Sequence, residues 1–308
     1  ANGGTTSSNT DGSITSTVQA NTKAGFSIVQ WTGTGSAGTL GHGLSSAPEL
    51  IMVKDTTVAY NWYVFTTATG SNIRFEGLNT DSASTPAASQ MTTTSTLIEN
   101  VPSVASLNTS GSAMIIYAFH SVSGYSKFGS YTGTGLSNGP IINTGFEPAY
   151  IMVKGSSNPG SWWIWDNKRN TTNPRNNILR ADTNGAEVTN TTYDVNFLSN
   201  GFQLIGTNTD VNGSGRTYIY MAFASDPSTA PVLADSFDTT IYDGSGTLRN
   251  VSGLGFSPSF AWIKNRVAAN SHNLYDTSRG ATKLLESDTT DAEATSSTGL
   301  TAFLNNGF

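Results

Sequence analysis

The sequence contains one pattern three times, and this repetition limits the folds that the chain can adopt. Each copy begins with an aromatic residue and a glycine-rich turn, and it ends in a short apolar run followed by a lysine. Residues 31–54, 131–154 and 242–264 read WTGTGSAGTLGHGLSSAPELIMVK, YTGTGLSNGPIINTGFEPAYIMVK and YDGSGTLRNVSGLGFSPSFAWIK. Repetition at this period predicts three copies of one structural unit, each long enough to bury a core of its own.

The register of the repeat holds beyond these segments. A proline precedes each lysine by six residues, and a tryptophan or histidine follows each lysine by eight. The repeat-defining positions are Pro48, Lys54, Pro148, Lys154, Pro258 and Lys264, followed by Trp62, Trp162 and His272. Residues that recur in every copy are most simply explained by a shared fold, because a single active site would mark only one copy. We therefore expect these positions to be structural.

The repeats predict a division of the chain into an N-terminal linker or arm (1–24) and three units (25–125, 126–232 and 233–308). The third unit ends at Asn306, Gly307 and Phe308, which match Asn200, Gly201 and Phe202 of the second. It lacks the last 20 or so residues that close the second unit. We expect this unit to be incomplete, with an open strand edge and core surface, and the sequence to be part of a longer chain.

Composition favours an all-β fold. The 308 residues include 39 Ser and 44 Thr but only 36 charged side chains, whereas exposed helices need Glu, Lys and Arg. Val, Ile, Tyr, Phe and Trp form short runs bounded by Gly, Pro and Asn, which is typical of strands joined by turns. The sequence predicts tandem β-sandwich modules of a jelly-roll-like type, stacked in a row, with a barrel as the lesser alternative.

Charge and composition exclude several classes of function. A formal net charge of −6 and the lack of a Lys/Arg cluster argue against nucleic-acid binding. Apolar runs such as residues 114–119 are too short for a membrane-spanning helix, so we expect no membrane insertion. Without cysteine and without a close-spaced histidine pattern, a zinc site is not expected, and no motif indicates another metal or a cofactor.

Candidate catalytic residues are few. His42, His120 and His272 occupy different positions in their units, so packing or turn roles are the simpler interpretation. Residues 210–215 resemble the first half of a calcium loop, but Met221 stands where the bidentate glutamate belongs, and a hairpin loop is the simpler reading. The GTG and GSG motifs lack the Lys and Thr of a phosphate loop and are expected to be turns.

Aromatic side chains are the remaining candidates for ligand contact. Trp62, Trp162, Trp163 and Trp165 could form a stacking platform for sugars, or they could pack in the core and between modules. Both faces of their strands are apolar, which favours packing. Two pairs with matching spacing, Asp166 with Arg169 and Asp276 with Arg279, are expected to be exposed ion pairs that hold a loop.

The combination of YTGTG, PxxIMVK and an aromatic strand resembles a repeat domain of bacteriophage structural proteins, familiar from marine phages. Residues 274–285 (LYDTSRGATKLL) and 300–308 (LTAFLNNGF) are similar to its later part. The resemblance covers about residues 25–308. It implies a virion protein, such as a tail fibre or a capsid decoration protein, and it transfers no catalytic residue.

The sequence thus predicts a non-enzymatic virion structural protein that folds in the host cytoplasm and is exposed on the particle. Other virion proteins and further copies of the chain are the expected partners, and a host surface polysaccharide is a possible one. Two alternatives stay open at this point. One is a carbohydrate-binding adhesin module, and the other is a glycan depolymerase, although no pair of carboxylates can be nominated for it.

Overall fold

The first repeat contains two antiparallel sheets. The computed structural model describes residues 5–87, 90–224 and 236–308. In spatial order, the larger sheet consists of β1 (Thr6–Asn9), β2 (Ser16–Asn21), β3 (Phe26–Thr32), β11 (Ala113–Phe119), β5 (Leu50–Asp55), β6 (Tyr63–Thr66), β7 (Ile73–Phe75) and β8 (Thr85–Pro86). The smaller sheet consists of β4 (Gly38–Gly41), β10 (Leu97–Val101) and β9 (Thr92–Thr93), and α1 (Ala105–Asn108) precedes β11.

The second repeat has the same strand order. Its larger sheet consists of β12 (Ser126–Thr132), β20 (Thr217–Ala224), β14 (Pro148–Gly155), β15 (Trp163–Asp166), β16 (Asn177–Arg180) and β17 (Val188–Thr189). The smaller one consists of β13 (Ile141–Asn143), β19 (Gly201–Leu204) and β18 (Val195–Leu198), with η1 (Thr191–Tyr193) before β18 and α2 (Thr209–Asn212) before β20. In both repeats the closing strand is internal to the larger sheet: β11 pairs with β3 and β5, and β20 pairs with β12 and β14.

The third repeat retains only part of this pattern. Its sheet consists of β21 (Phe260–Ile263), β22 (Asn273–Asp276), β23 (Lys283–Glu286) and β24 (Ala294–Thr295). These strands match β5 to β8 and β14 to β17 in order and in position relative to the lysine. Among the residues that the structure describes, β21 is the edge strand of this sheet, whereas β5 and β14 are internal.

Strand alternation distributes apolar residues to two cores. In β14, Ile151 and Val153 pack into a core within the second repeat, and Met152 points to the opposite face. Met152 belongs to a central core that draws on all three repeats, including Phe26 of the first and Leu274 of the third. Because successive side chains of a strand point to opposite faces, an uninterrupted apolar run serves both cores.

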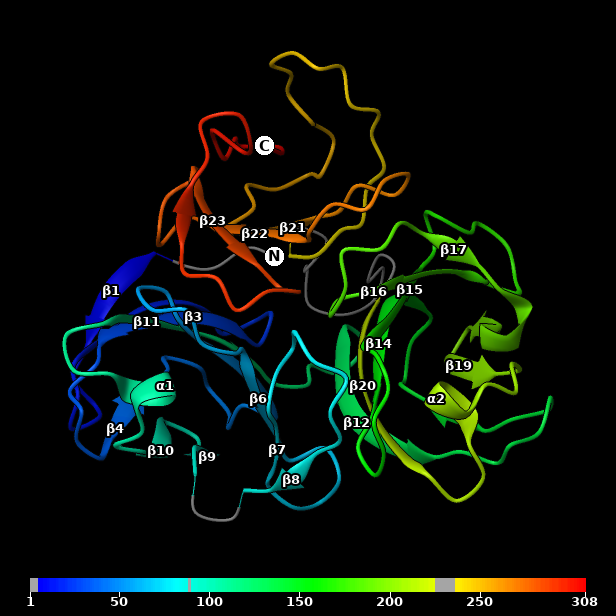
Figure 1. Cartoon of the computed structure of the whole chain (residues 1–308), viewed down its shortest axis with the longest axis horizontal. Helices are drawn as coiled ribbons and strands as arrows, with labels where there is room; N and C mark the ends of the chain where they lie inside the picture. The colour runs from blue at the N-terminus through cyan, green and yellow to red at the C-terminus, as the bar shows by residue number, and fades with distance from the viewer. Residues whose placement is uncertain (1–4, 88–89, 225–235) are drawn as a thin grey trace.

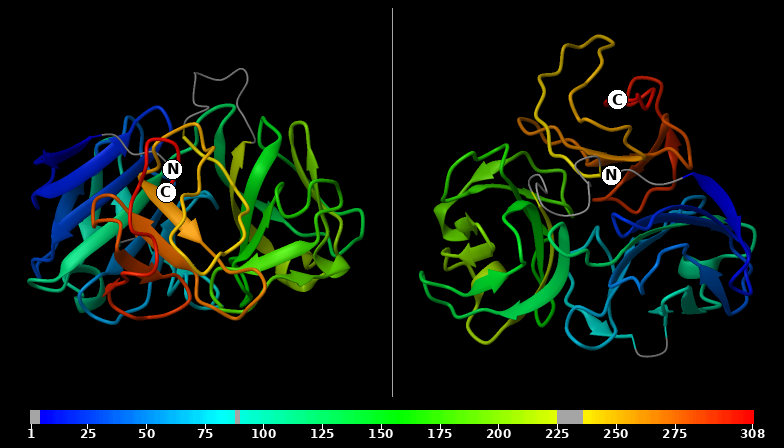
Figure 2. Two further views of the ribbon diagram at one scale, coloured as in Figure 1. Left: turned by 90° about the horizontal axis from the view of Figure 1, so that it is seen from above. Right: turned by 180° about the vertical axis from the view of Figure 1, so that it is seen from behind.

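The molecule is nearly all β-structure with sandwich-type packing of antiparallel sheets, as the sequence predicts. The expected row of stacked modules is not what the structure shows. The three repeats surround a common centre and give a three-lobed body, with the first repeat in blue and cyan, the second in green and the third in orange and red (Figures 1 and 2). The large sheets pack around that centre because each has a second apolar face, which points away from the core of its own repeat and into the central core.

Residues 1–24 are expected from the sequence to form an N-terminal linker or arm, but part of this segment belongs to the first sheet. Strands β1 and β2 form a hairpin, and β2 pairs with β3 over Thr17–Asn21, so the hairpin extends the first sheet. Gln19 in this hairpin contacts the third repeat: its Oε1 accepts hydrogen bonds from the hydroxyls of Thr277, at 2.8 Å, and Ser278, at 2.9 Å. The hairpin therefore links the first and third repeats.

Candidate functional site: the junctions between repeats

The repeat-defining lysines lie at the junctions between lobes. Lys54 and Lys154 are fully buried. Lys154 Nζ donates to the backbone oxygen of Gly160 in its own repeat, at 2.5 Å, and to that of Asp81 in the first repeat, at 2.9 Å. Lys54 Nζ donates to Tyr60 in its own repeat, at 2.7 Å, and to Thr290 in the third, at 3.0 Å.

The third lysine completes the set. Lys264 Nζ donates to the backbone oxygen of Asn184 in the second repeat, at 3.1 Å. The first repeat thus donates to the third, the third to the second, and the second to the first. At each junction the lysine of one repeat meets a carbonyl-bearing loop of another, so the three lobes form a closed ring through related contacts, as a cyclic trimer does.

The acceptor positions are equivalent as well. Asp81, Asn184 and Thr290 each lie two residues after a side chain that accepts the backbone N–H of Trp62, Trp162 or His272. These three side chains are Asn79, Asp182 and Asp288, at 2.9, 3.0 and 2.9 Å from the respective nitrogens. Each loop is therefore held from inside its own repeat while it presents a carbonyl to the lysine of another.

Backbone groups bond across the same three junctions in the opposite direction. The N–H of Ser84 donates to the oxygen of Ser156, at 3.0 Å, and the N–H of Glu187 donates to that of Arg266, at 2.8 Å. The third member is Glu293, which donates to Thr56 at 2.8 Å. In all three bonds the acceptor stands two residues after a repeat-defining lysine. Both repeats at each junction thus satisfy polar groups that burial would otherwise leave unpaired.

Two of the nominated tryptophans belong to these junctions. Trp62 Nε1 donates to the backbone oxygen of Glu286 in the third repeat, at 2.8 Å, and Trp162 Nε1 donates to Gly77 in the first, at 3.1 Å. Trp163 and Trp165 instead pack in the core of the second repeat. All four side chains are buried, with at most 5% of any residue exposed, so none offers an open ring face to a sugar.

His272 takes the tryptophan position in the third repeat. It is buried, and its Nδ1 accepts a hydrogen bond of 2.9 Å from Trp262 Nε1. Burial lowers the pKa of His272 to about 3, and the nearby charge of Lys264 acts in the same direction. Met52 and Met152 stand where the third repeat has Trp262. The first and second repeats therefore have methionine and tryptophan at these two positions, and the third has tryptophan and histidine.

Burial also changes the lysines. It lowers the pKa of Lys54 to about 8, although Asp55 and Asp291 oppose the shift. The pKa of Lys154 falls to about 8 for the same reason, with Asp182 and Asp81 opposing the change. The two carbonyls that face each lysine can be satisfied by a neutral amine, because that form retains two N–H donors.

The ion pairs that the sequence predicts are formed, but they are buried rather than exposed. Arg169 pairs with Asp166 and, at 3.0 Å, with Glu187. Arg279 Nε lies 2.6 Å from Asp276 Oδ2, with 3% and 0% of their side chains exposed. Tyr117 of the first repeat donates its hydroxyl proton to Asp276 at 2.7 Å. Tyr117 thus covers the pair of Asp276 and Arg279 from the first repeat.

Aromatic contacts continue the central core across the junctions. Phe75 of the first repeat meets Trp162 of the second edge-on, with ring centroids 5.0 Å apart. Tyr117 and Phe260 join the first and third repeats at 4.8 Å. Pairs of this kind contribute about 0.5–1.5 kcal/mol beyond the area that they bury.

Other candidates have structural roles. Asn212 of the calcium-like segment is fully buried; its Oδ1 accepts the N–H of Thr134, at 2.9 Å, and its amide donates to two carbonyls. It thereby holds the GTG turn, as Asn108 does in the first repeat through the N–H of Thr34. A Cβ on Gly33 would lie 1.9 Å from the oxygen of Thr109, so this turn requires glycine.

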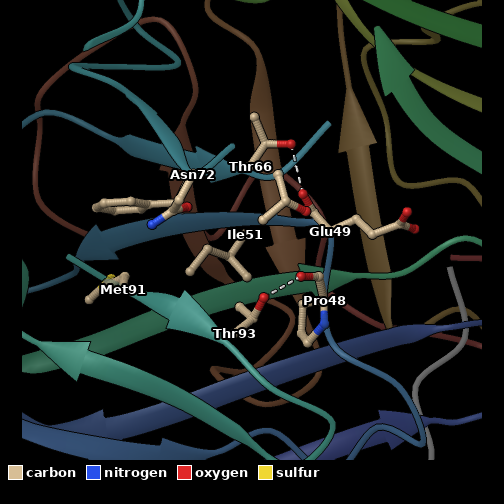
Figure 3. Close-up of a pocket in the computed structure, with 9 residues that line it drawn as sticks. Pro48, Glu49, Ile51, Thr66, Asn72, Met91 and Thr93 are labelled. Carbon is tan, nitrogen blue, oxygen red and sulfur yellow. Dashed lines mark hydrogen bonds between the residues drawn. The ribbon is translucent and has the colours of Figure 1, made fainter. Parts of the chain in front are cut away.

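Two hollows that the described residues line differ greatly in size. The smaller, beside Pro48, encloses about 160 Å³ including open solvent, below the ~300–1,000 Å³ typical of ligand sites (Figure 3). Its polar groups bond to each other: Thr93 Oγ1 donates to the oxygen of Pro48 and Thr66 Oγ1 to that of Glu49, both at 2.7 Å. The larger encloses about 2,840 Å³ on the same measure and lies between the third repeat and the central core.

Within residues 5–87, 90–224 and 236–308, no group of three or more His, Asp or Glu residues is placed to hold a metal ion. In the same ranges, no helix is long and apolar enough to cross a membrane.

A family model matches residues 1–227 and 233–308. The chain belongs to the DUF7483 family. DUF7483 is described as a domain of unknown function, and its second match begins at the residue where the sequence places the third unit. No curated protein and no solved structure matches the chain.

In this DUF7483 chain, the sequence identified the side-chain donors at the junctions but not the groups that accept their hydrogen bonds. The lysines and tryptophans leave a periodic signal. Their acceptors are backbone carbonyls, which any residue supplies, so Asp81, Asn184 and Thr290 share no residue type. Asn79, Asp182 and Asp288 recur at equivalent positions two residues earlier, and they are the side chains from which the acceptor loops could have been identified.

Proposed function

We propose that this chain is a non-enzymatic structural protein of a bacteriophage particle, a fibre or decoration component that contacts other virion proteins. The virion assignment depends on the resemblance of the repeats to phage structural proteins. The observation that supports a passive role is the use of the repeat-defining residues. Lys54, Lys154 and Lys264 all hold one lobe against another.

The chemistry of the buried polar groups agrees with this role. The two charge clusters centred on Arg169 and Arg279 are paired within the protein, and their carboxylates face guanidinium groups. The four tryptophans nominated for sugar stacking are buried. These tryptophans therefore do not support a contact with a host polysaccharide. We assign no binding site to the adhesin alternative and no catalytic site to the depolymerase alternative.

Surface composition fits a particle component. Charged residues are sparse and the net charge is −6, so the exposed surface is mainly hydroxyl and amide groups that solvate well without strong ionic attraction. Homo-oligomerisation is part of the proposal, because appendages of virus particles follow the symmetry of the particle.

The test is the location of the protein. Mass spectrometry of purified particles of the virus that encodes the chain should detect it in stoichiometric amounts, and cryo-electron microscopy should place the three-lobed body on their surface. Its absence from purified particles would refute the proposal. Incubation with host capsule and a glycan array are the companion measurements. Release of oligosaccharides would replace the proposal with a depolymerase, and binding to host glycans alone would favour an adhesin.

A further inference from the structure

The larger hollow lies at a defined position in the repeat pattern. It is lined by the segment 237–244, by β21 and by side chains of the central core such as Phe223 and Tyr117. Segment 236–242 corresponds to β3 and β12, because Tyr242 opens the third glycine turn as Trp31 and Tyr131 open the first two. The hollow therefore separates the third repeat's counterparts of β12 and β14.

In the other repeats a strand fills this position. β11 pairs with β3 on one side and with β5 on the other, over its full length on the first side. β20 pairs in the same way with β12 and β14. In the part of the chain that the structure describes, the third repeat has no strand there, and segment 236–242 is not a strand.

Side chains beside the hollow are less buried than their equivalents. Met52, Val53, Met152 and Val153 are at most 2% exposed, whereas Trp262 and Ile263 at the same positions are only partly buried. Tyr131 is 8% exposed and Tyr242 38%. Within the described ranges, the third repeat's own core has three buried apolar residues, against seventeen and eighteen in the first and second.

The two existing closing strands define what fits. β11 is AMIIYAF and β20 is TYIYMAFA, of seven and eight residues, with no charged side chain. Apart from the first residue of each, all their residues are buried, because one face meets the central core and the other meets the core of the repeat. An occupant of the hollow must be apolar on both faces and extended.

We propose that the hollow is a strand-docking site, and that its occupant is a partner peptide segment of the β11 and β20 type, uncharged, extended and apolar on both faces. The segment inserts between residues 236–242 and β21 and completes the third sheet. Backbone hydrogen bonds to the flanking segments and apolar contacts on both faces hold it, as in other cases of strand addition. This inference depends on the fold alone and is independent of the proposed virion location.

The test is a titration of the 308-residue protein with a synthetic peptide of the β20 sequence, flanked by lysines for solubility. We expect saturable binding, a change in the tryptophan fluorescence of the protein, and amide hydrogen exchange at least tenfold slower in Ala261–Ile263 and in residues 237–242. A peptide with proline in place of two central residues is the matched control, because proline cannot donate to a strand ladder. It should not bind.

A variant of the site gives a second, independent readout. Ile263→Asp places a charge at the wall of the hollow and should reduce peptide affinity at least tenfold. Leu248→Asp makes the same change at a residue that is 88% exposed and outside the lining, and it should bind as the unmodified protein does. The proposal is overturned if the β20 peptide does not bind the unmodified protein, if the proline peptide binds equally well, or if exchange slows at β8 or β17 instead. If Ile263→Asp does not fold, the comparison of the two peptides decides.

Discussion

Lys154 Nζ lies 2.9 Å from the backbone oxygen of Asp81, which is 73 residues earlier in the chain and in another repeat. Lys54 and Lys264 make related bonds to Thr290 and Asn184. These contacts make each repeat depend on its neighbours, and they lead to predictions about stability.

Lys154→Met should destabilise the fold by about 2–4 kcal/mol at pH 7, because the carbonyls of Gly160 and Asp81 lose a buried donor. Urea denaturation followed by tryptophan fluorescence measures the change. Lys23→Met, at an exposed residue, is the control and should alter the free energy of unfolding by less than about 0.5 kcal/mol. Equal stability of the two variants would show that the junction bond contributes nothing.

Stability should rise between pH 8 and 10. The pKa of Lys54 and that of Lys154 are about 8 in the folded protein, against 10.5 in the unfolded chain. In this range the unfolded chain holds protons that the folded protein has released, so raising the pH favours folding by about 2 kcal/mol per lysine. Above pH 10 the trend reverses, because burial raises the pKa of Tyr117 and Tyr131 and only the unfolded chain ionises them. Unfolding by urea at successive pH values tests this, and the Lys54→Met, Lys154→Met double variant should lack the rise.

Acid should destabilise the third repeat's junction through His272. Its pKa is about 3 when folded and 6.5 when unfolded, so the unfolded chain binds a proton that the folded protein does not, and stability is lost as the pH falls from 6.5 towards 3. The loss from this residue is about 3 kcal/mol at pH 4. The double variant Trp262→Met, His272→Trp restores the residues of the other two repeats and should lose less stability between pH 7 and 4.

The single variants provide the contrast. His272→Trp alone overfills a packed site and should cost about 1–3 kcal/mol at pH 7, whereas adding Trp262→Met should recover most of that loss. A double-mutant cycle by thermal and urea unfolding measures the coupling. Additive effects would indicate that the two positions do not compensate each other.

The buried pair of Asp276 and Arg279 should be sensitive to the loss of one member. Asp276→Thr leaves Arg279 without its closest carboxylate and should cost about 3–5 kcal/mol, because the buried guanidinium then keeps only Glu293, at 3.3 Å, as an ion-pair partner. The first repeat has Thr66 and Thr69 at these positions, so the double variant Asp276→Thr, Arg279→Thr should cost less than the single one. A double variant as unstable as the sum of the singles would contradict this.

Sequence reasoning reached the all-β fold and the register of the repeats because apolar periodicity and the lysine and tryptophan spacing are side-chain signals. It placed Trp62 and Trp162 among residues for packing or ligand contact, and both lie at junctions. It did not predict the ring, because the acceptors of these side chains are backbone carbonyls that leave no trace in residue type. It judged the pair of Asp276 and Arg279 exposed because Tyr117, which covers this pair, belongs to the first repeat.

Native-state hydrogen exchange at the amides of Ser84, Glu187 and Glu293 is the most direct test of the closed ring. Each amide lies in or beside a short edge strand and donates to a carbonyl of another repeat. All three should exchange roughly 100-fold or more slowly than the exposed loop amide of Leu248, because they open only when a junction separates. Exchange of all three at the rate of Leu248 would contradict the account, since the repeats would then be separate modules.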